Sequence, residues 1–136
     1  MGLATLLLLA TGACSSSSIS LPPDTTTTAE GLVILCALYR NVKLIDHNTG
    51  DSELNERSWK QHLRLASNLV SFAPRQIEGA VWDYLHIVEA QGLLVEQLEW
   101  IDTSKIPVEA QQSLNAQLRP LLNGAAALKS FTNKYC

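Results

Sequence analysis

Apolar residues recur every three or four positions from about residue 27 to the end of this chain of 136 residues. That spacing places them on one side of an α-helix, and no stretch alternates with the period of two that a half-buried strand shows. Polar turns at 46–50 and 102–107 separate the apolar runs. The pattern predicts an all-α fold, a four-helix up-down-up-down bundle preceded by a flexible tether.

The ends of the first two helices are marked in the sequence. A capping box at Thr27 begins the first helix, which should end near Ile45. Asp51 or Ser52 can cap the second helix, and Pro74 ends it because proline disfavours helical geometry in the residue before it. The apolar positions of these two helices, which we expect in the core, are Leu32, Leu35, Cys36, Tyr39, Val42, Trp59, Leu63, Ala66, Leu69, Val70 and Ala73.

The last two helices carry a proline and a glycine that affect their course. Pro74 suits the first position of the third helix, which we expect to continue through Gly92 to about Trp100. Pro120 removes one backbone hydrogen bond from the fourth helix and should kink it. The apolar positions are Ile77, Val81, Tyr84, Leu85, Val88, Val95 and Leu98, then Leu114, Leu118, Leu121, Leu122, Ala125, Leu128, Phe131 and Tyr135.

Near its start the chain has a short apolar run, residues 3–10, with the length of a signal-peptide core. It is far shorter than the roughly 20 residues of a membrane-spanning helix. Thr11, Gly12, Ala13 and Cys14 follow the run. This stretch resembles the lipobox of bacterial lipoproteins, in which the cysteine is acylated and becomes the first residue of the mature protein. An ordinary signal peptide cleaved after Ala13 and an uncleaved segment are the alternatives.

The resemblance implies a signal peptide (1–13), a lipidated Cys14 with a tether (14–26) and the helical domain (27–136). The tether is rich in serine, threonine and proline, and it contains too few apolar residues to offset its chain entropy, so we expect it to be flexible. The lipid would anchor the protein on the extracytoplasmic side of a membrane. In that family Ser15 favours the outer membrane where the host has one. The layout is also similar to that of small uncharacterised helical lipoproteins, a similarity that implies no activity.

Three cysteines, Cys14, Cys36 and Cys136, are an odd number for an exported protein. If Cys14 carries lipid, the other two remain, and an oxidising compartment lets them pair. A Cys36–Cys136 disulfide would tie the end of the chain to the first helix and, in the chain-entropy model, contribute about 4 kcal/mol. The alternative is two independent thiols, one buried and one at the end of the chain.

Charge and motifs argue against two classes of function. The chain has 10 Lys and Arg, 13 Asp and Glu, a net charge of -3 and no basic run, so it lacks the basic footprint of a nucleic-acid-binding protein. It has no Gly-x-Ser-x-Gly, His-Glu-x-x-His or Cys-x-x-Cys motif and no glycine-rich phosphate loop. We therefore expect neither an enzyme nor a cofactor.

The three histidines are the candidates for a metal site. His47 lies in a polar loop, and we expect it to be solvated. His62 and His86 would lie at a similar level if the second and third helices form a hairpin, and Asp83 could share a helix face with His86. However, His86 falls nearly opposite the core positions of its helix, so the two rings should not converge. We expect no metal site.

The third helix carries a second apolar stripe on its back, formed by Trp82, His86, Leu93 and Trp100. A surface helix normally has one apolar face, and tryptophans are enriched where proteins bind one another. We interpret the stripe as a docking surface for another envelope protein. The alternatives are that this helix is buried on two sides, or that Gly92 resets the helical phase.

A second hypothesis makes the bundle a carrier of an apolar ligand. The alanines at 125–127 and the kink at Pro120 could leave space between the helices. Small residues more often permit close helix packing, and we favour that interpretation. The sequence thus predicts a membrane-anchored helical interaction module, with a ligand carrier as the alternative.

Overall fold

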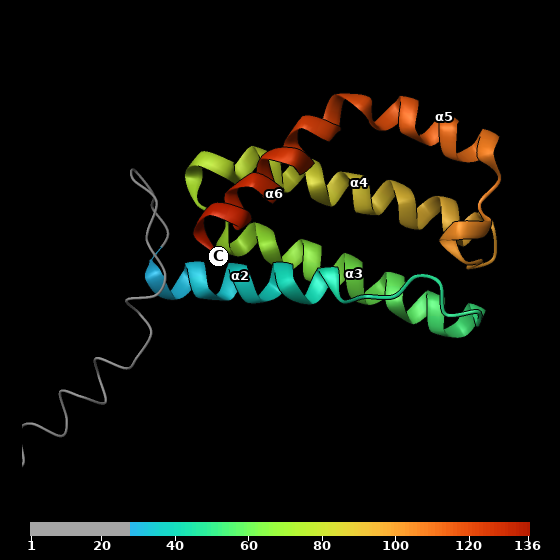
Figure 1. The fold of residues 1–136 in the computed structure, drawn as a ribbon, viewed down its shortest axis with the longest axis horizontal. Helices are drawn as coiled ribbons and strands as arrows, with labels where there is room; N and C mark the ends of the chain where they lie inside the picture. Colours follow the sequence, from blue (N-terminus) through green and yellow to red (C-terminus); the bar gives the residue numbers. More distant parts are fainter. Residues whose placement is uncertain (1–27) are drawn as a thin grey trace, which may run out of the picture.

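A computed structural model describes residues 28–136, so the predictions on the signal peptide, Cys14 and the tether lie outside the described residues. Within this range the chain forms helices and no strand. The first three helices alternate in direction, and the last two helices both run back along the third (Figure 1). The predicted all-α, up-down-up-down bundle is therefore confirmed. No helix of the described part is long and apolar enough to cross a membrane. The four helices that pack together are α2 (Ala29–Lys43), α3 (Ser52–Phe72), α4 (Glu78–Gln97) and α6 (Leu122–Tyr135).

Side-chain caps begin the first two helices. The Thr28 hydroxyl accepts a hydrogen bond from the Gly31 N–H at 3.0 Å and caps α2, one residue after the predicted cap. The Asp51 carboxylate caps α3, as predicted, by accepting from the N–H groups of Glu53 at 2.9 Å and Leu54 at 3.1 Å. Both caps satisfy N–H groups that have no partner inside the helix.

The chain turns sharply between α3 and α4. Pro74 is buried and extended, and a 3-10 turn, η2 (Arg75–Ile77), separates it from α4. The prediction that Pro74 opens the helix was therefore wrong by about one turn. Gly92 lies within α4, as predicted, but the helix ends at Gln97 and not near Trp100.

The predicted fourth helix is two helices. A 3-10 turn, η3 (Thr103–Lys105), leads into α5 (Val108–Leu118), and a second, η4 (Arg119–Leu121), separates α5 from α6. Pro120 lies in η4, and because it has no backbone N–H, one helical hydrogen bond is lost there. The expected kink is thus a complete break, which lets α6 pack across α4 while α5 lies over the other end of α4 (Figure 1).

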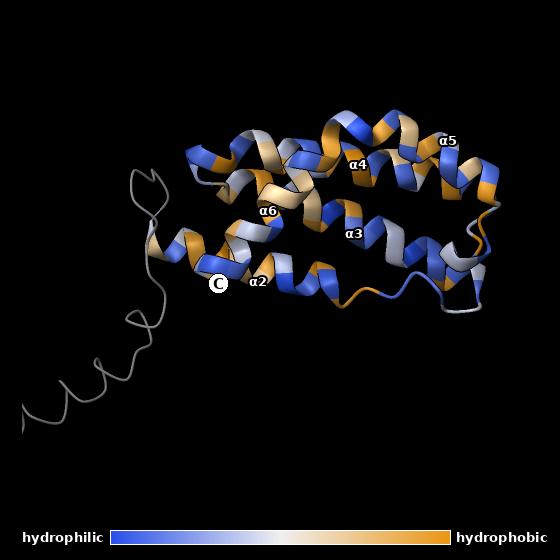
Figure 2. Ribbon diagram, turned by 45° about the horizontal axis from the view of Figure 1, so that its top comes forward, coloured by the Kyte–Doolittle hydropathy of each residue, from blue (hydrophilic) through white to orange (hydrophobic). Residues whose placement is uncertain are grey.

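The core consists of two apolar clusters, one at each end of the α3–α4 pair. Polar and apolar bands alternate around the helices, as expected for helices that bury one face (Figure 2). Two leucines predicted in the core are exposed, Leu63 by 39% and Leu122 by 48%. The first cluster comprises Leu32, Leu35, Cys36, Leu69, Ile77, Val81, Leu128 and Phe131, and the second comprises Trp59, Ala66, Leu85, Val88 and Val95.

A disulfide and a glycine hold α6 in place. Cys36 and Cys136 are bonded across 100 residues of sequence, with Cα atoms 5.5 Å apart, so the predicted bridge is confirmed. It fastens the end of α6 to the middle of α2 and, in the chain-entropy model, is worth about 4 kcal/mol. Gly124 is buried where α6 crosses α4, and a Cβ there would collide with the side chain of Asp83. The close crossing therefore requires glycine at this position.

Candidate docking face on helices α3 and α4

A groove of about 480 Å³ runs between α3 and α4. Its floor is apolar, with Trp59 5% exposed and Val88 1% exposed, and Gly92 leaves a gap between them. Leu63 and Leu93, which are 39% and 59% exposed, line its sides. A concave apolar surface lined by exposed leucines is a candidate binding site. We call it the α3–α4 groove.

Trp82, His86 and Leu93 lie on one face of α4, as their spacing of four and seven residues requires. Trp82 is 43% exposed, His86 is exposed, and their ring centroids are 5.9 Å apart. We call these three residues the outer stripe. Leu93 belongs both to the stripe and to the groove, so the two are continuous, and we call them together the candidate docking face, or docking face for short.

Trp100 does not extend the outer stripe, and this part of the prediction was wrong. It follows the end of α4, where Glu99 and Trp100 both have a φ of 59°, in the left-handed region. Its side chain is half-buried, packs against the second core cluster and lines the end of the α3–α4 groove. Trp100 thus contributes to the docking face as part of the groove.

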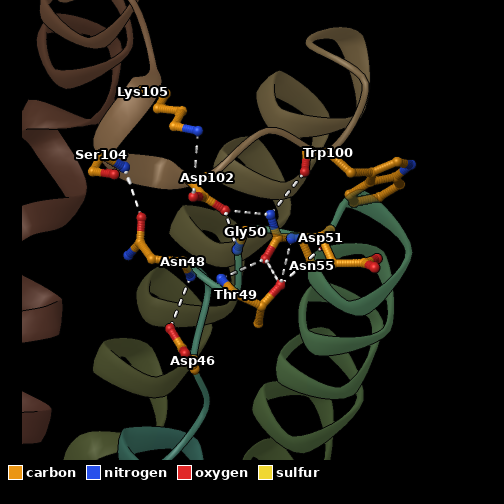
Figure 3. Close-up of polar contacts among 10 residues, drawn as sticks. All are labelled: Asp46, Asn48, Thr49, Gly50, Asp51, Asn55, Trp100, Asp102, Ser104 and Lys105. Atoms are coloured by element: carbon orange, nitrogen blue, oxygen red, sulfur yellow. Dashed lines mark hydrogen bonds and ion pairs between the residues drawn. The ribbon is translucent and has the colours of Figure 1, made fainter.

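Asn55 holds the segment after α4 in this unusual conformation (Figure 3). This buried amide donates to the Trp100 carbonyl at 2.9 Å and to the Asp102 carboxylate at 2.8 Å. Its oxygen accepts from the N–H and the hydroxyl of Thr49. Three of the four hydrogen bonds that an asparagine side chain can make are thus formed, and for the fourth Asn55 shares the single Thr49 hydroxyl proton with the Asp51 carbonyl. Sequence reasoning missed Asn55, although a polar residue at a helical core position is a recognisable signal.

Further hydrogen bonds complete this connection, which we call the Asn55 latch. Asp102 also accepts from the Gly50 N–H at 3.0 Å, and Asn48 accepts from the Ser104 N–H at 2.9 Å (Figure 3). Hydrogen bonds from Asn55 and Gly50 lower the pKa of the Asp102 carboxyl, which keeps it ionised. The latch joins the loop after α2 to the segment after α4, and so fixes the end of the groove.

Glutamates surround the groove. Glu56 forms an ion pair with Lys60 at 2.9 Å. Glu89 and Glu96 are exposed, and neither takes part in an ion pair within residues 28–136. The docking face is thus apolar at its centre and acidic at its border, an arrangement that is typical of protein interfaces.

His47 was expected to be solvated, and this was wrong. Because α2 is shorter than α3, the loop after α2 runs along the part of α3 that α2 does not reach (Figure 1). The His47 ring stacks on Trp59, with centroids 4.0 Å apart, and covers the second core cluster. Its Nε2 lies 2.9 Å from Nδ1 of His62, whose Nε2 lies 2.7 Å from the hydroxyl of Tyr84. The loop therefore takes the place of a further helical turn.

The row formed by His47, His62 and Tyr84 is neutral. Burial, together with a smaller effect of the nearby His47, lowers the pKa of His62 to about 4. Burial also lowers the pKa of His47 against the opposing effect of Asp46, and burial raises the pKa of Tyr84. A neutral imidazole has one donor and one acceptor nitrogen, so the hydrogen bonds of the row can all point in one direction or all in the other. Either way the row supports the loop by hydrogen bonds.

The histidines of the two helices point in different directions. His62 faces His47 and Tyr84, whereas His86 lies beside Trp82 on the outer stripe. Within the described part of the chain, no group of three or more histidine, cysteine, aspartate or glutamate side chains is placed to hold a metal ion.

A scan against protein-family models, a search of the curated proteins and a search of the solved structures each found no match to this chain.

The Asn55 latch predicts that Asn55→Asp is strongly destabilising at pH 7. The substitution keeps the shape of the side chain but places a carboxylate against the Trp100 carbonyl and the Asp102 carboxylate. We expect the free energy of unfolding to fall by about 3 kcal/mol, measured by urea denaturation. Asn68→Asp, at an exposed position of the same helix, is the control and should cost about 0.5 kcal/mol or less. Equal losses in the two variants would contradict the assigned role of Asn55.

The histidine row predicts a loss of stability in acid. The pKa of His62 is lower in the folded chain than its ordinary 6.5, so its contribution to stability is complete above pH 6.5 and is lost towards pH 4. We expect a loss of about 2 kcal/mol by pH 4, less than the roughly 3 kcal/mol to which the full pKa shift corresponds, because the His62 side chain is only partly buried. Urea denaturation at pH 7, 5.5 and 4 measures it. His62→Gln should remove this part of the pH dependence, and an unchanged dependence in that variant would count against the assignment.

Proposed function

We propose that this protein is a lipid-anchored interaction module of the bacterial cell envelope, and that its docking face captures an envelope protein. The lipobox-like sequence ending at Cys14 supports the anchor. The tether of residues 14–26 would hold the helical domain away from the membrane, so that the docking face is free to meet a partner.

The exposure of Trp82 and Leu93 carries the proposal. These side chains are 43% and 59% exposed on a helix whose other faces pack against α3 and α6. Leaving large apolar side chains in water costs about 25 cal/mol for each Å² that could be buried, so a partner that covers them gains affinity. Tryptophan is also the residue most enriched among the energetic centres of protein interfaces.

A carrier of an apolar ligand has weaker support. The pocket beside His47 and His62 has a volume of about 240 Å³, below the roughly 300–1,000 Å³ of typical small-molecule sites. The α3–α4 groove, at about 480 Å³, is large enough but is lined by exposed leucines and does not lie inside the bundle. Its lining mixes leucine and valine with amide side chains such as Gln91 and Asn115. Ala126 and Ala127 are exposed, so they do not line a space inside the bundle. We therefore retain the interaction module.

Photo-crosslinking in intact cells of the native host tests the proposal. A crosslinking amino acid at Trp82 and another at Leu93 should give an adduct with the same envelope protein, identified by mass spectrometry. Leu44, which is 76% exposed on the loop after α2, is the control position and should not give this adduct. For the double variant Trp82→Ala/Leu93→Ala the crosslinking amino acid is placed at position 89. This variant should fold, as judged by circular dichroism, and should lose the adduct that the same crosslinker forms when Trp82 and Leu93 are present.

Two results would contradict the proposal. Identical adducts from Leu44 and Leu93 would show that the docking face has no preference for a partner. An unfolded double variant would show that the two side chains stabilise the fold. The anchor is checked in the same cells, because Cys14→Ser should move the protein out of the membrane fraction and should weaken the adducts.

A further inference from the structure

We propose that the α3–α4 groove binds an amphipathic helix of the partner, which places one large apolar side chain over Gly92 between two lysine or arginine residues. This inference rests on the proposed function and specifies the chemistry of the partner. Three observations support it: a glycine that packing does not require, an apolar floor beneath it, and two glutamates on either side of it.

Gly92 is not required by the fold. It lies inside α4, five residues before the helix ends, with ordinary helical geometry, and a Cβ there would meet only the Trp59 ring, at 3.9 Å, which is a normal van der Waals contact. Alanine would therefore fit and would stabilise the helix by about 1 kcal/mol. Gly124, by contrast, is enforced by Asp83. What Gly92 provides is open space on the floor of the groove.

The space above Gly92 suits an apolar side chain presented by a helix. Trp59 and Val88 form its floor, and Leu63 and Leu93 rise on either side from two antiparallel helices. A groove between two helices commonly accepts a third helix, whose anchor side chains follow one another at one-turn intervals. The groove volume of about 480 Å³ exceeds one side chain, so neighbouring turns of the partner also contact it.

Charge selects the partner. Glu89 precedes Gly92 by three residues and Glu96 follows it by four, which places the Cα atoms of the two glutamates about 10 Å apart along α4. Neither has an ion-pair partner within residues 28–136, whereas the nearby Lys60 is paired with Glu56. Lysine or arginine one turn before and one turn after the anchor residue would meet both carboxylates. An anionic membrane surface would be repelled by them.

The amino-terminal part of this chain is a poor occupant on the same ground. The first 39 residues contain no lysine or arginine, so they cannot neutralise Glu89 and Glu96. The complementary charges must therefore come from another molecule.

Binding of synthetic helices to the full chain, purified from membranes in detergent, tests the inference. Each peptide has about 18 residues on an alanine-rich helical background. The first carries leucine flanked by lysines four residues before and three after, the second replaces both lysines by glutamine, and the third replaces the leucine by alanine. Fluorescence polarisation should show binding of the first peptide, with the other two at least tenfold weaker. Raising the salt concentration should weaken the first peptide severalfold.

Matched variants separate the groove from the charges. Gly92→Leu fills the groove and should weaken the first peptide at least 30-fold, whereas Gly92→Ala should change its affinity less than fivefold. Glu89→Gln/Glu96→Gln should weaken the lysine peptide about tenfold and leave the glutamine peptide unchanged. Glu53→Gln/Glu109→Gln, at exposed positions away from the groove, should weaken neither.

Several outcomes would overturn the inference. If Gly92→Leu folds and binds as tightly as the wild type, the groove is not the site. If the lysine and glutamine peptides bind equally, or if no peptide binds, the partner is not a basic helix, although crosslinks from Trp82 and Leu93 would still support the proposed function. Self-association or binding to anionic vesicles that Gly92→Leu abolishes would identify a second copy or a membrane as the occupant. Absence of those crosslinks is the separate failure of the proposed function.

Discussion

The packing of α4 on two sides determines the rest of this structure. α4 contacts α3 along one side and α6 along another, and both core clusters depend on its side chains. Its apolar residues occupy more of its circumference than these two neighbours cover. Trp82 and Leu93 are what remains, and they face outward. They stay exposed although α4 packs against α3, α6 and, in its second half, α5.

Gly92 of α4 and Gly124 of α6 have different roles. Gly124 permits the close crossing of α6, since any side chain there would collide with Asp83. Gly92 lowers helix stability without a packing requirement, and it leaves the groove open. The Asn55 latch then closes the end of the groove by fixing Trp100 in a left-handed conformation.

The sequence predicts those features that depend on the local spacing of residues. It does not predict the placement of side chains that contacts with distant residues determine. The buried positions of α2, the Asp51 cap and the Cys36–Cys136 bridge follow from periodicity, capping chemistry and cysteine number. Trp100 leaves the helix because an amide 45 residues earlier binds its carbonyl. His47 is covered because its ring stacks on Trp59, a contact that only the course of the loop along α3 creates. The groove was missed because Leu63 has the spacing of a core residue and Gly92 suggests only a possible helix end.

The accessibility of the three tryptophan indoles in the folded protein tests most directly whether the proposed docking face is open. Nuclear magnetic resonance of the labelled indole N–H groups, with a soluble paramagnetic reagent added, measures it for each side chain. We predict strong broadening for Trp82, weaker broadening for Trp100 and none for Trp59, in the order of their exposure. If Trp82 were as protected as Trp59, the face would already be covered within the protein itself, and the account of an open docking face would be contradicted.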